Sequence, residues 1–207
     1  MRLYLASTSP ARLATLRAVG VEPVLLSSGV DEDAVAATAG PLSGPALVQL
    51  LARAKAEAVV GRSPIDGFIL GGDSAFEIDG TLYGKPHLPE VARERWRAQR
   101  GRTGMLHSGH WLIDHRGGTL GRAVGGVSTA SVTFADTITD EEIDAYVATG
   151  EPLQVAGAFT IDSLGAPFIS RVDGDPHAVV GLSVALVRTL LLEFDVPWHT
   201  LWNRQEL

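Results

Sequence analysis

The chain opens with a pattern that predicts a strand, a tight turn and a helix. A short apolar run, Leu3-Tyr4-Leu5, leads into small hydroxyl residues. Ser9 stands at the expected helix N-cap, and Pro10 follows at the first helical position, where a missing N–H costs nothing. Apolar residues then recur at helical spacing up to a glycine cap, at Leu13, Leu16, Val19 and Gly20. Because unpaired N–H groups at a helix N-terminus attract anions, this turn and the nearby Arg12 form a candidate phosphate site. The same pattern also caps helices that bind nothing.

The remaining pattern alternates strands with helices and predicts an α/β fold. Strands are expected over residues 23–27, 68–70, 76–78, 81–83, 106–134 with a turn at 116–118, 157–161 and 168–172. Helices are expected over 45–60, with Leu47, Leu50, Leu51, Ala54 and Ala58 on the apolar side, and over 89–99, 139–149 and 182–194. The polar stretch 29–44 is expected to be irregular, and Asp79-Gly80 to form a hairpin turn. We expect a single domain, residues 1–207, built as two lobes around a central cleft.

Composition narrows the class of protein. The 207 residues include no cysteine, which excludes disulfides and thiolate metal sites. The formal net charge is −7 and no basic run is present, which argues against nucleic acid or an anionic membrane as a partner. No apolar run reaches the length of a membrane span or signal peptide, so we expect a soluble cytoplasmic protein. Lysine occurs only at Lys55 and Lys85.

Acidic residues and the two lysines are the candidates for chemistry. Asp73 is expected just past the end of a buried strand, where open α/β sheets usually carry functional groups, with Gly71 and Gly72 allowing a ligand to approach. The alternative is a turn aspartate that bonds its own backbone. The run 31–33 (Asp-Glu-Asp) could supply a ligand for Mg²⁺, or be an ordinary acidic loop. Lys85 lies in a loop defined by glycine and proline, and Lys55 could be a solvated helix lysine.

The histidines do not predict a zinc site. His107 and His110 are three residues apart in an expected strand, which places them on opposite faces. His107 and His115 share a face but lie about 26 Å apart at a rise of roughly 3.3 Å per residue. A Gly-x-Ser-x-Gly nucleophile elbow is also absent from the sequence, which argues against a serine hydrolase.

Eight blocks spread along the chain resemble one known family. They are 5–12 (Leu-Ala-Ser-Thr-Ser-Pro-Ala-Arg), 30–32 (Val-Asp-Glu), 54–56 (Ala-Lys-Ala), 72–74 (Gly-Asp-Ser), 84–86 (Gly-Lys-Pro), 132–134 (Val-Thr-Phe), 156–159 (Ala-Gly-Ala-Phe) and 179–182 (Val-Val-Gly-Leu). In this order they are similar to the Maf family, bacterial septum-formation-type proteins that act as nucleoside triphosphate pyrophosphatases. The resemblance implies an elongated mixed-sheet α/β fold related to inosine triphosphatases, a possible homodimer, and hydrolysis of a nucleoside triphosphate to the monophosphate and pyrophosphate. It also implies a divalent cation, Mg²⁺ or Mn²⁺.

The resemblance assigns roles to individual residues. Asp73 is similar to the catalytic carboxylate and general base of the family, and Glu32 to a partner that holds the metal or positions water, so both are expected metal ligands. The residues similar to substrate ligands are Ser7, Arg12, Lys55, Ser74 and Lys85, of which Lys85 also looks catalytic. The alternative is a nucleotide-binding regulator of cell division that no longer turns over. The retained carboxylates and lysines favour the enzyme.

Several positions depart from the family pattern. Ala11 stands in place of a common arginine, Gly104 in place of a common histidine, and Ser183 in place of a proline. Asp162 stands where the branch acting on dTTP and UTP has a glutamine near the base. Because a carboxylate cannot donate the hydrogen bond of an amide, Asp162 predicts either weak discrimination between bases or a preference shifted away from dTTP and UTP. The pattern looks most like the actinobacterial branch of the family.

Overall fold

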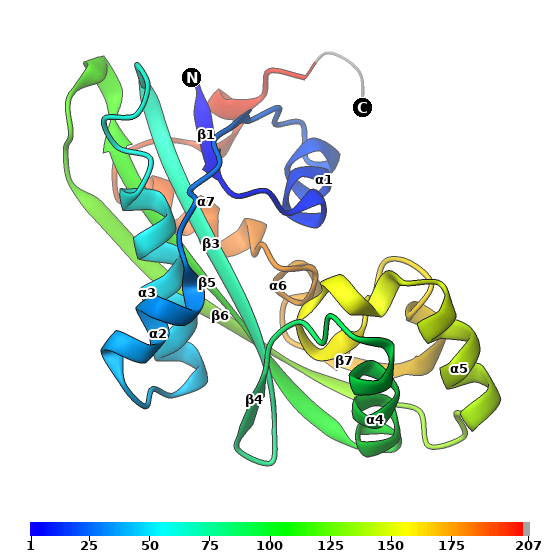
Figure 1. The fold of residues 1–207 in the computed structure, drawn as a ribbon. Coiled ribbons are helices and arrows are strands. Elements are labelled where there is room, and N and C mark those ends of the chain that lie inside the picture. Colours follow the sequence, from blue (N-terminus) through cyan, green and yellow to red (C-terminus); the bar gives the residue numbers. More distant parts are fainter. Residues whose placement is uncertain (205–207) are drawn as a thin grey trace. The chain divides into compact units, whose positions relative to one another are not determined.

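The computed structural model describes residues 1–204. Its strands, labelled as in Figure 1, are β1 (Leu3–Ala6), β2 (Val24–Leu25), β3 (Gly67–Ile78), β4 (Thr81–Tyr83), β5 (Thr103–His115), β6 (Ala123–Phe134) and β7 (Ile169–Asp173). Its α-helices are α1 (Pro10–Ala18), α2 (Glu32–Ala39), α3 (Gly44–Glu57), α4 (Pro89–Gln99), α5 (Asp140–Ala148), α6 (Pro176–Val180) and α7 (Val184–Leu192). This alternation confirms the α/β class.

Within the described chain, the seven strands form one mixed sheet. The strand order is β2-β1-β3-β5-β6-β7, and β4 pairs with β3. Strand β1 runs parallel to both β2 and β3, with Leu5 opposite Leu70, whereas β4 is antiparallel to β3 and β7 is antiparallel to β6. The expected mixed-sheet architecture is therefore confirmed.

The chain forms two compact units. The terminal unit contains Met1–Asp73, Ser108–Ser128 and the segment from Gly181 onward, and the central unit contains Ser74–His107 and Thr129–Val180. Strands β3, β5 and β6 contribute residues to both units. The single domain expected over residues 1–207 stays a prediction.

Each unit has its own hydrophobic core. In the terminal unit, Leu70 packs with Leu16 of α1 and Leu190 of α7, whereas the next residue back along β3, Ile69, packs with Ala56 of α3. Successive strand residues point to opposite faces, so β3 is covered by helices on both sides, as central strands of α/β sheets are. The core of the central unit is aromatic and includes Trp96, whose ring contacts the ring edges of neighbours such as Phe134.

The helix caps and the hairpin turn that the sequence predicts are confirmed. Ser9 caps α1 by accepting a hydrogen bond from the Arg12 N–H, and Thr139 forms a reciprocal capping box with Glu142 at the start of α5. Asp79 and Gly80, with φ of 50° and 74°, make the expected turn between β3 and β4.

Four expectations about elements are wrong. Residues 157–161 form no strand; a 3₁₀ turn covers Ala156–Ala158. The stretch 29–44 contains α2, which Asp31 caps by accepting from the Ala34 N–H at 2.9 Å. Helix α3 buries a different face from the expected one, at Gly44, Val48, Leu51, Ala52, Lys55 and Ala56. Strand β2 covers only two of the five residues expected in 23–27.

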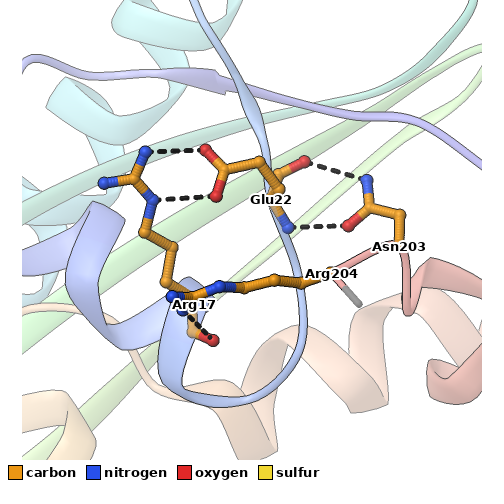
Figure 2. Close-up of polar contacts among 4 residues, drawn as sticks. All are labelled: Arg17, Glu22, Asn203 and Arg204. Carbon is orange, nitrogen blue, oxygen red and sulfur yellow. Dashed lines mark hydrogen bonds and ion pairs between the residues drawn. The ribbon is translucent and has the colours of Figure 1, made fainter. Parts of the chain in front are cut away.

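The end of the described chain is tied to the loop after α1 (Figure 2). The Arg17 guanidinium donates two hydrogen bonds of 2.8 Å to the Glu22 carboxylate, and the Asn203 side chain bonds both the N–H and the carbonyl of Glu22. Arg204 donates to the Arg17 carbonyl at 2.9 Å. The segment that follows α7 therefore covers the C-terminal end of α1. No helix in the described part of the chain is long and apolar enough to cross a membrane.

Candidate active site

Asp73 lies inside strand β3 rather than past its end. The strand runs on for five residues beyond Asp73, up to Ile78, so the expected position of this carboxylate is corrected. Asp73 is only 6% exposed, and burial raises its pKa, although the nearby cations Lys55 and Arg12 oppose the shift. A carboxylate with raised pKa is a better proton acceptor than an ordinary aspartate.

Lys55 binds this carboxylate directly. Its Nζ lies 2.6 Å from Asp73 Oδ1 and 2.7 Å from Glu32 Oε1. Lys55 is 7% exposed, so the alternative of a solvated helix lysine is wrong. Residues 18 positions apart in sequence thus form a buried ion pair, and Glu32 joins it from the first turn of α2.

Two glycines bring α3 close enough to the sheet for this contact. A Cβ on Gly71 would lie 2.1 Å from the Ala52 carbonyl oxygen, and a Cβ on Gly109 would lie 2.3 Å from that of Val48. The helix backbone therefore packs directly on the strand backbones. Lys55 follows Ala52 by three residues, and Asp73 follows Gly71 by two, so the close approach at Gly71 carries their side chains together.

Arg12 and Ser7 complete the cluster in the terminal unit. Arg12 Nε donates to the Gly181 carbonyl at 2.8 Å, and Nη1 donates to Ser7 Oγ at 3.3 Å. A Cβ on Gly72 would lie 3.2 Å from Arg12 Nε, so the second glycine makes room for this side chain. Burial lowers the pKa of Arg12, whereas Asp73 and Glu32 act to raise it. Gly71 and Gly72, which the sequence suggested would let a ligand approach, instead make room for α3 and for the Arg12 side chain.

The other candidate residues, Ser74, Lys85 and Asp162, belong to the central unit. Ser74 is the residue after Asp73 on β3. Lys85 is exposed, in a loop whose ends are fixed: Arg95 donates to the Gly84 carbonyl at 2.6 Å, and the His87 N–H donates to the Leu153 carbonyl at 3.0 Å. Asp162 is exposed in the segment between the 3₁₀ turn Ala156–Ala158 and β7.

The described residues contain no ready-made metal cage. Among residues 1–204, no group of three or more His, Asp or Glu side chains could hold an ion alone. The carboxylates of Glu32 and Asp73 nevertheless converge on one ammonium group. A family model described as "Maf-like protein" matches residues 2–194 of this sequence.

The chain belongs to the Maf family.

Curated Maf relatives match this chain over nearly its whole length. A protein of Leifsonia xyli subsp. xyli named "Nucleoside triphosphate pyrophosphatase" is 67% identical over 211 residues, covering 99% of this chain and 98% of that protein. Proteins with the same name from Salinispora tropica and Nocardia farcinica are 50% and 49% identical, covering 99% and 97% of this chain and 88% and 96% of theirs.

A solved structure outside these relatives supports the fold. The Staphylococcus aureus Ham1 protein superposes with a TM-score of 0.50 over 95% of this chain and 100% of its own. Its sequence identity is 14%, so the similarity bears on the fold alone.

Sequence reasoning missed two groups that fix the segment Gly181–Ser183 beside the cluster of this Maf protein. The first is the Gly181 carbonyl, which accepts from Arg12. The second is His110, fully buried on β5, whose Nε2 accepts from the Ser183 N–H at 3.0 Å while Nδ1 faces the Ser108 carbonyl at 3.1 Å. The block 179–182 contains Gly181 but gave its carbonyl no role. For His110, strand periodicity indicated only that its side chain lies on the face opposite to that of His107.

Proposed function

We propose that this protein hydrolyses nucleoside triphosphates to the nucleoside monophosphate and pyrophosphate. The observation that carries the proposal is Asp73: a buried carboxylate of raised pKa, bound by Lys55 within a cluster that also contains Arg12. The names of the Maf relatives support the same activity. The actinobacterial affinity indicated by the sequence agrees with the sources of these relatives.

In the proposed reaction, Asp73 acts as the general base. It accepts a proton from water as the water oxygen bonds to the α-phosphorus, and the bond from that phosphorus to the bridging oxygen breaks with pyrophosphate as the leaving group. Burial favours this role because it raises the proton affinity of the carboxylate. An ammonium has three N–H donors, so Lys55 can hold both carboxylates and still donate to a phosphate oxygen.

The remaining proposed ligands bind the two ends of the nucleotide. Ser7 and Arg12 would bind phosphate oxygens at the start of α1, where the N-terminus of the helix also favours an anion. Lys85 and Ser74 are proposed as further triphosphate ligands, and Lys85 would offset the charge that develops in the transition state. Asp162 would accept hydrogen bonds from an exocyclic amine of the base, which favours cytosine, adenine and guanine over thymine and uracil.

The two carboxylates fit a hard divalent cation. Mg²⁺ and Mn²⁺ are commonly held by one or two carboxylates together with substrate oxygens, and Glu32 and Asp73 supply such a pair. When bound, the ion would neutralise triphosphate charge and polarise a phosphoryl oxygen. Because these two carboxylates alone make no closed cage, oxygens of the substrate would supply further ligands to the cation.

Product identity tests the proposal. The protein is incubated with each common nucleoside triphosphate and Mg²⁺ or Mn²⁺, and the products are separated by anion-exchange chromatography. We expect the monophosphate and pyrophosphate in equal amounts. Diphosphate and inorganic phosphate would place the cleaved bond elsewhere, and binding without any product would favour a regulator.

A further inference from the structure

The carboxylate of Glu151 has an unusual set of partners. Glu151 begins the 3₁₀ turn η2 (Glu151–Gln154), directly after Gly150, whose φ of 79° turns the chain away from α5. It accepts hydrogen bonds from three hydroxyls, those of Tyr146 at 2.9 Å, Thr160 at 2.6 Å and Ser163 at 2.6 Å. It also accepts from the backbone N–H groups of Leu164 and Gly165, at 3.3 and 3.2 Å.

These partners are all neutral. Among the ion pairs of residues 1–204, none includes Glu151. Burial alone would raise the pKa of Glu151, but the hydrogen bonds from Ser163, Thr160 and Tyr146 outweigh it and hold the pKa below its usual value. The carboxylate is therefore ionised at neutral pH, and its charge is balanced by oriented dipoles.

Four of the five donors come from one loop, Thr160–Gly165. The Gly165 N–H also donates to the Thr160 hydroxyl at 3.2 Å, which closes the loop on itself. A Cβ on Gly165 would lie 2.7 Å from both the Thr160 carbonyl oxygen and the Tyr146 hydroxyl, so only glycine fits there. Glu151 therefore acts as the common anchor of this loop.

The anchor also adjoins the Lys85 loop. Leu153, two residues after Glu151 in the same turn, accepts a hydrogen bond from the His87 N–H, and His87 lies two residues after Lys85. The turn η2 thus forms hydrogen bonds with both the loop that carries Lys85 and the loop that carries Asp162. All of these residues belong to the central unit.

We propose that Glu151 is a positioning residue that holds Asp162 where it selects the nucleobase, without touching the substrate itself. The inference rests on the proposed function, because it takes Asp162 as the base-facing residue. Asp162 lies between two residues, Thr160 and Ser163, whose hydroxyls Glu151 binds. The clamp fixes its backbone, so a nucleotide finds the carboxylate already in place.

Glu151→Gln is the decisive variant. Oε1 accepts from the Gly165 N–H and Oε2 from the Leu164 N–H, so one of these two donors faces an amide NH₂ whichever way the glutamine turns. Hydroxyls can rotate to accept instead, but a backbone N–H cannot. Glu141→Gln is the matched control, since it removes the same charge at an exposed position of the same unit.

The first measurement is amide hydrogen exchange of residues 160–165, followed by mass spectrometry. The second is the affinity, by calorimetry, of non-hydrolysable α,β-methylene triphosphates carrying adenine, cytosine or uracil. We expect Glu151→Gln to speed exchange in the loop and to reduce the preference for the amine-bearing bases by about tenfold. In an Asp162→Asn background, Glu151→Gln should change the base ranking no further. Ser163→Ala removes one donor and should give a smaller loss of the same kind, which covers the case of an unfolded Glu151 variant.

Each contrary result overturns the inference. Unchanged exchange in Glu151→Gln would show that the carboxylate does not hold the loop. Faster exchange with an unchanged base ranking would show that the loop does not set selectivity. Equal affinities of the unmodified protein for the three triphosphates would show the same. Because binding is measured without turnover, these outcomes are independent of whether pyrophosphate is released.

Discussion

Lys55 Nζ lies 2.6 Å from Asp73 Oδ1, and both residues are less than 8% exposed. The pair is therefore a buried one, unlike the exposed Arg53–Glu57 pair on the same helix. Removing one partner of a buried pair leaves a charge without compensation, which costs far more than losing an exposed pair.

Lys55→Met should therefore destabilise the protein by about 3 kcal/mol at pH 7, as judged by urea unfolding. The matched control, Arg53→Met, should cost less than about 1 kcal/mol because its partner stays solvated. Equal losses in the two variants would mean that the buried pair contributes no more than a surface one.

Asp73→Asn should separate catalysis from binding. The amide keeps the size of the carboxylate but accepts no proton, so turnover should fall by about 10² to 10⁴ if Asp73 is the general base. Affinity for a non-hydrolysable triphosphate should be retained, since a negative charge near the phosphates is removed. Near-normal turnover in this variant would leave Asp73 a structural residue of the cluster.

If Asp73 is the general base, its raised pKa should determine the acid limb of activity. The base works only when deprotonated, so kcat/KM should fall as the pH drops through its raised pKa, above the usual 3.8 of an aspartate. Stability responds with the opposite sign. Between the usual and the raised pKa the folded state holds a proton that the unfolded state releases, so stability falls as pH rises. Kinetics and urea unfolding at matched pH should show both trends, and Asp73→Asn should remove this part of the stability slope.

Glu32→Gln should weaken metal binding in the presence of nucleotide. Mn²⁺ bound together with a non-hydrolysable triphosphate can be followed by electron paramagnetic resonance, without any turnover. We expect a loss of about tenfold or more in Mn²⁺ affinity, because a carboxylate ligand becomes a neutral amide. Asp33→Asn removes the same charge from the same helical turn and should change affinity much less. Similar losses in both variants would point to general electrostatics.

Asp162→Gln should move preference towards dTTP and UTP. The amide can donate to a carbonyl of thymine or uracil, whereas the carboxylate repels it. The expected change is on the order of tenfold in relative kcat/KM, measured as pyrophosphate release from each nucleotide. A ranking that stays the same after the substitution would mean that Asp162 does not face the base.

Structure set by neighbouring residues could be read from the sequence. The cap at Ser9, the turn at Asp79-Gly80 and the capping box at Thr139 depend on side chains within a few positions of one another. Helix α4 was predicted with its observed limits, and Pro89 stands at its first position, where a proline favours a helix start. The turn and cap at the start of α1 were visible for the same reason, and phosphate binding there stays a prediction.

Structure set by distant partners could not be read from the sequence. The expected strand at 157–161 is replaced by a turn because Gln99 and Trp96 donate to the Gly157 and Ala158 carbonyls, taking acceptors that a sheet would use. The buried face of α3 follows from the missing side chains at Gly71 and Gly109, a packing effect that helical periodicity does not contain. The Glu151 clamp could not be predicted because its donors are ordinary hydroxyls and backbone amides, which form no distinctive sequence pattern.

The first residue of the chain contacts the segment that follows α7 in the terminal unit. The Met1 ammonium donates to the Thr200 carbonyl at 3.2 Å, and Asn203 is fixed to Glu22. A flexible linker from Arg204 back to Met1 would allow the chain to be reopened at the exposed Gly117-Gly118 turn. Such a circular permutant would start inside the former β5–β6 connection, yet would present Lys55 and Asp73 to each other from the same helix and strand.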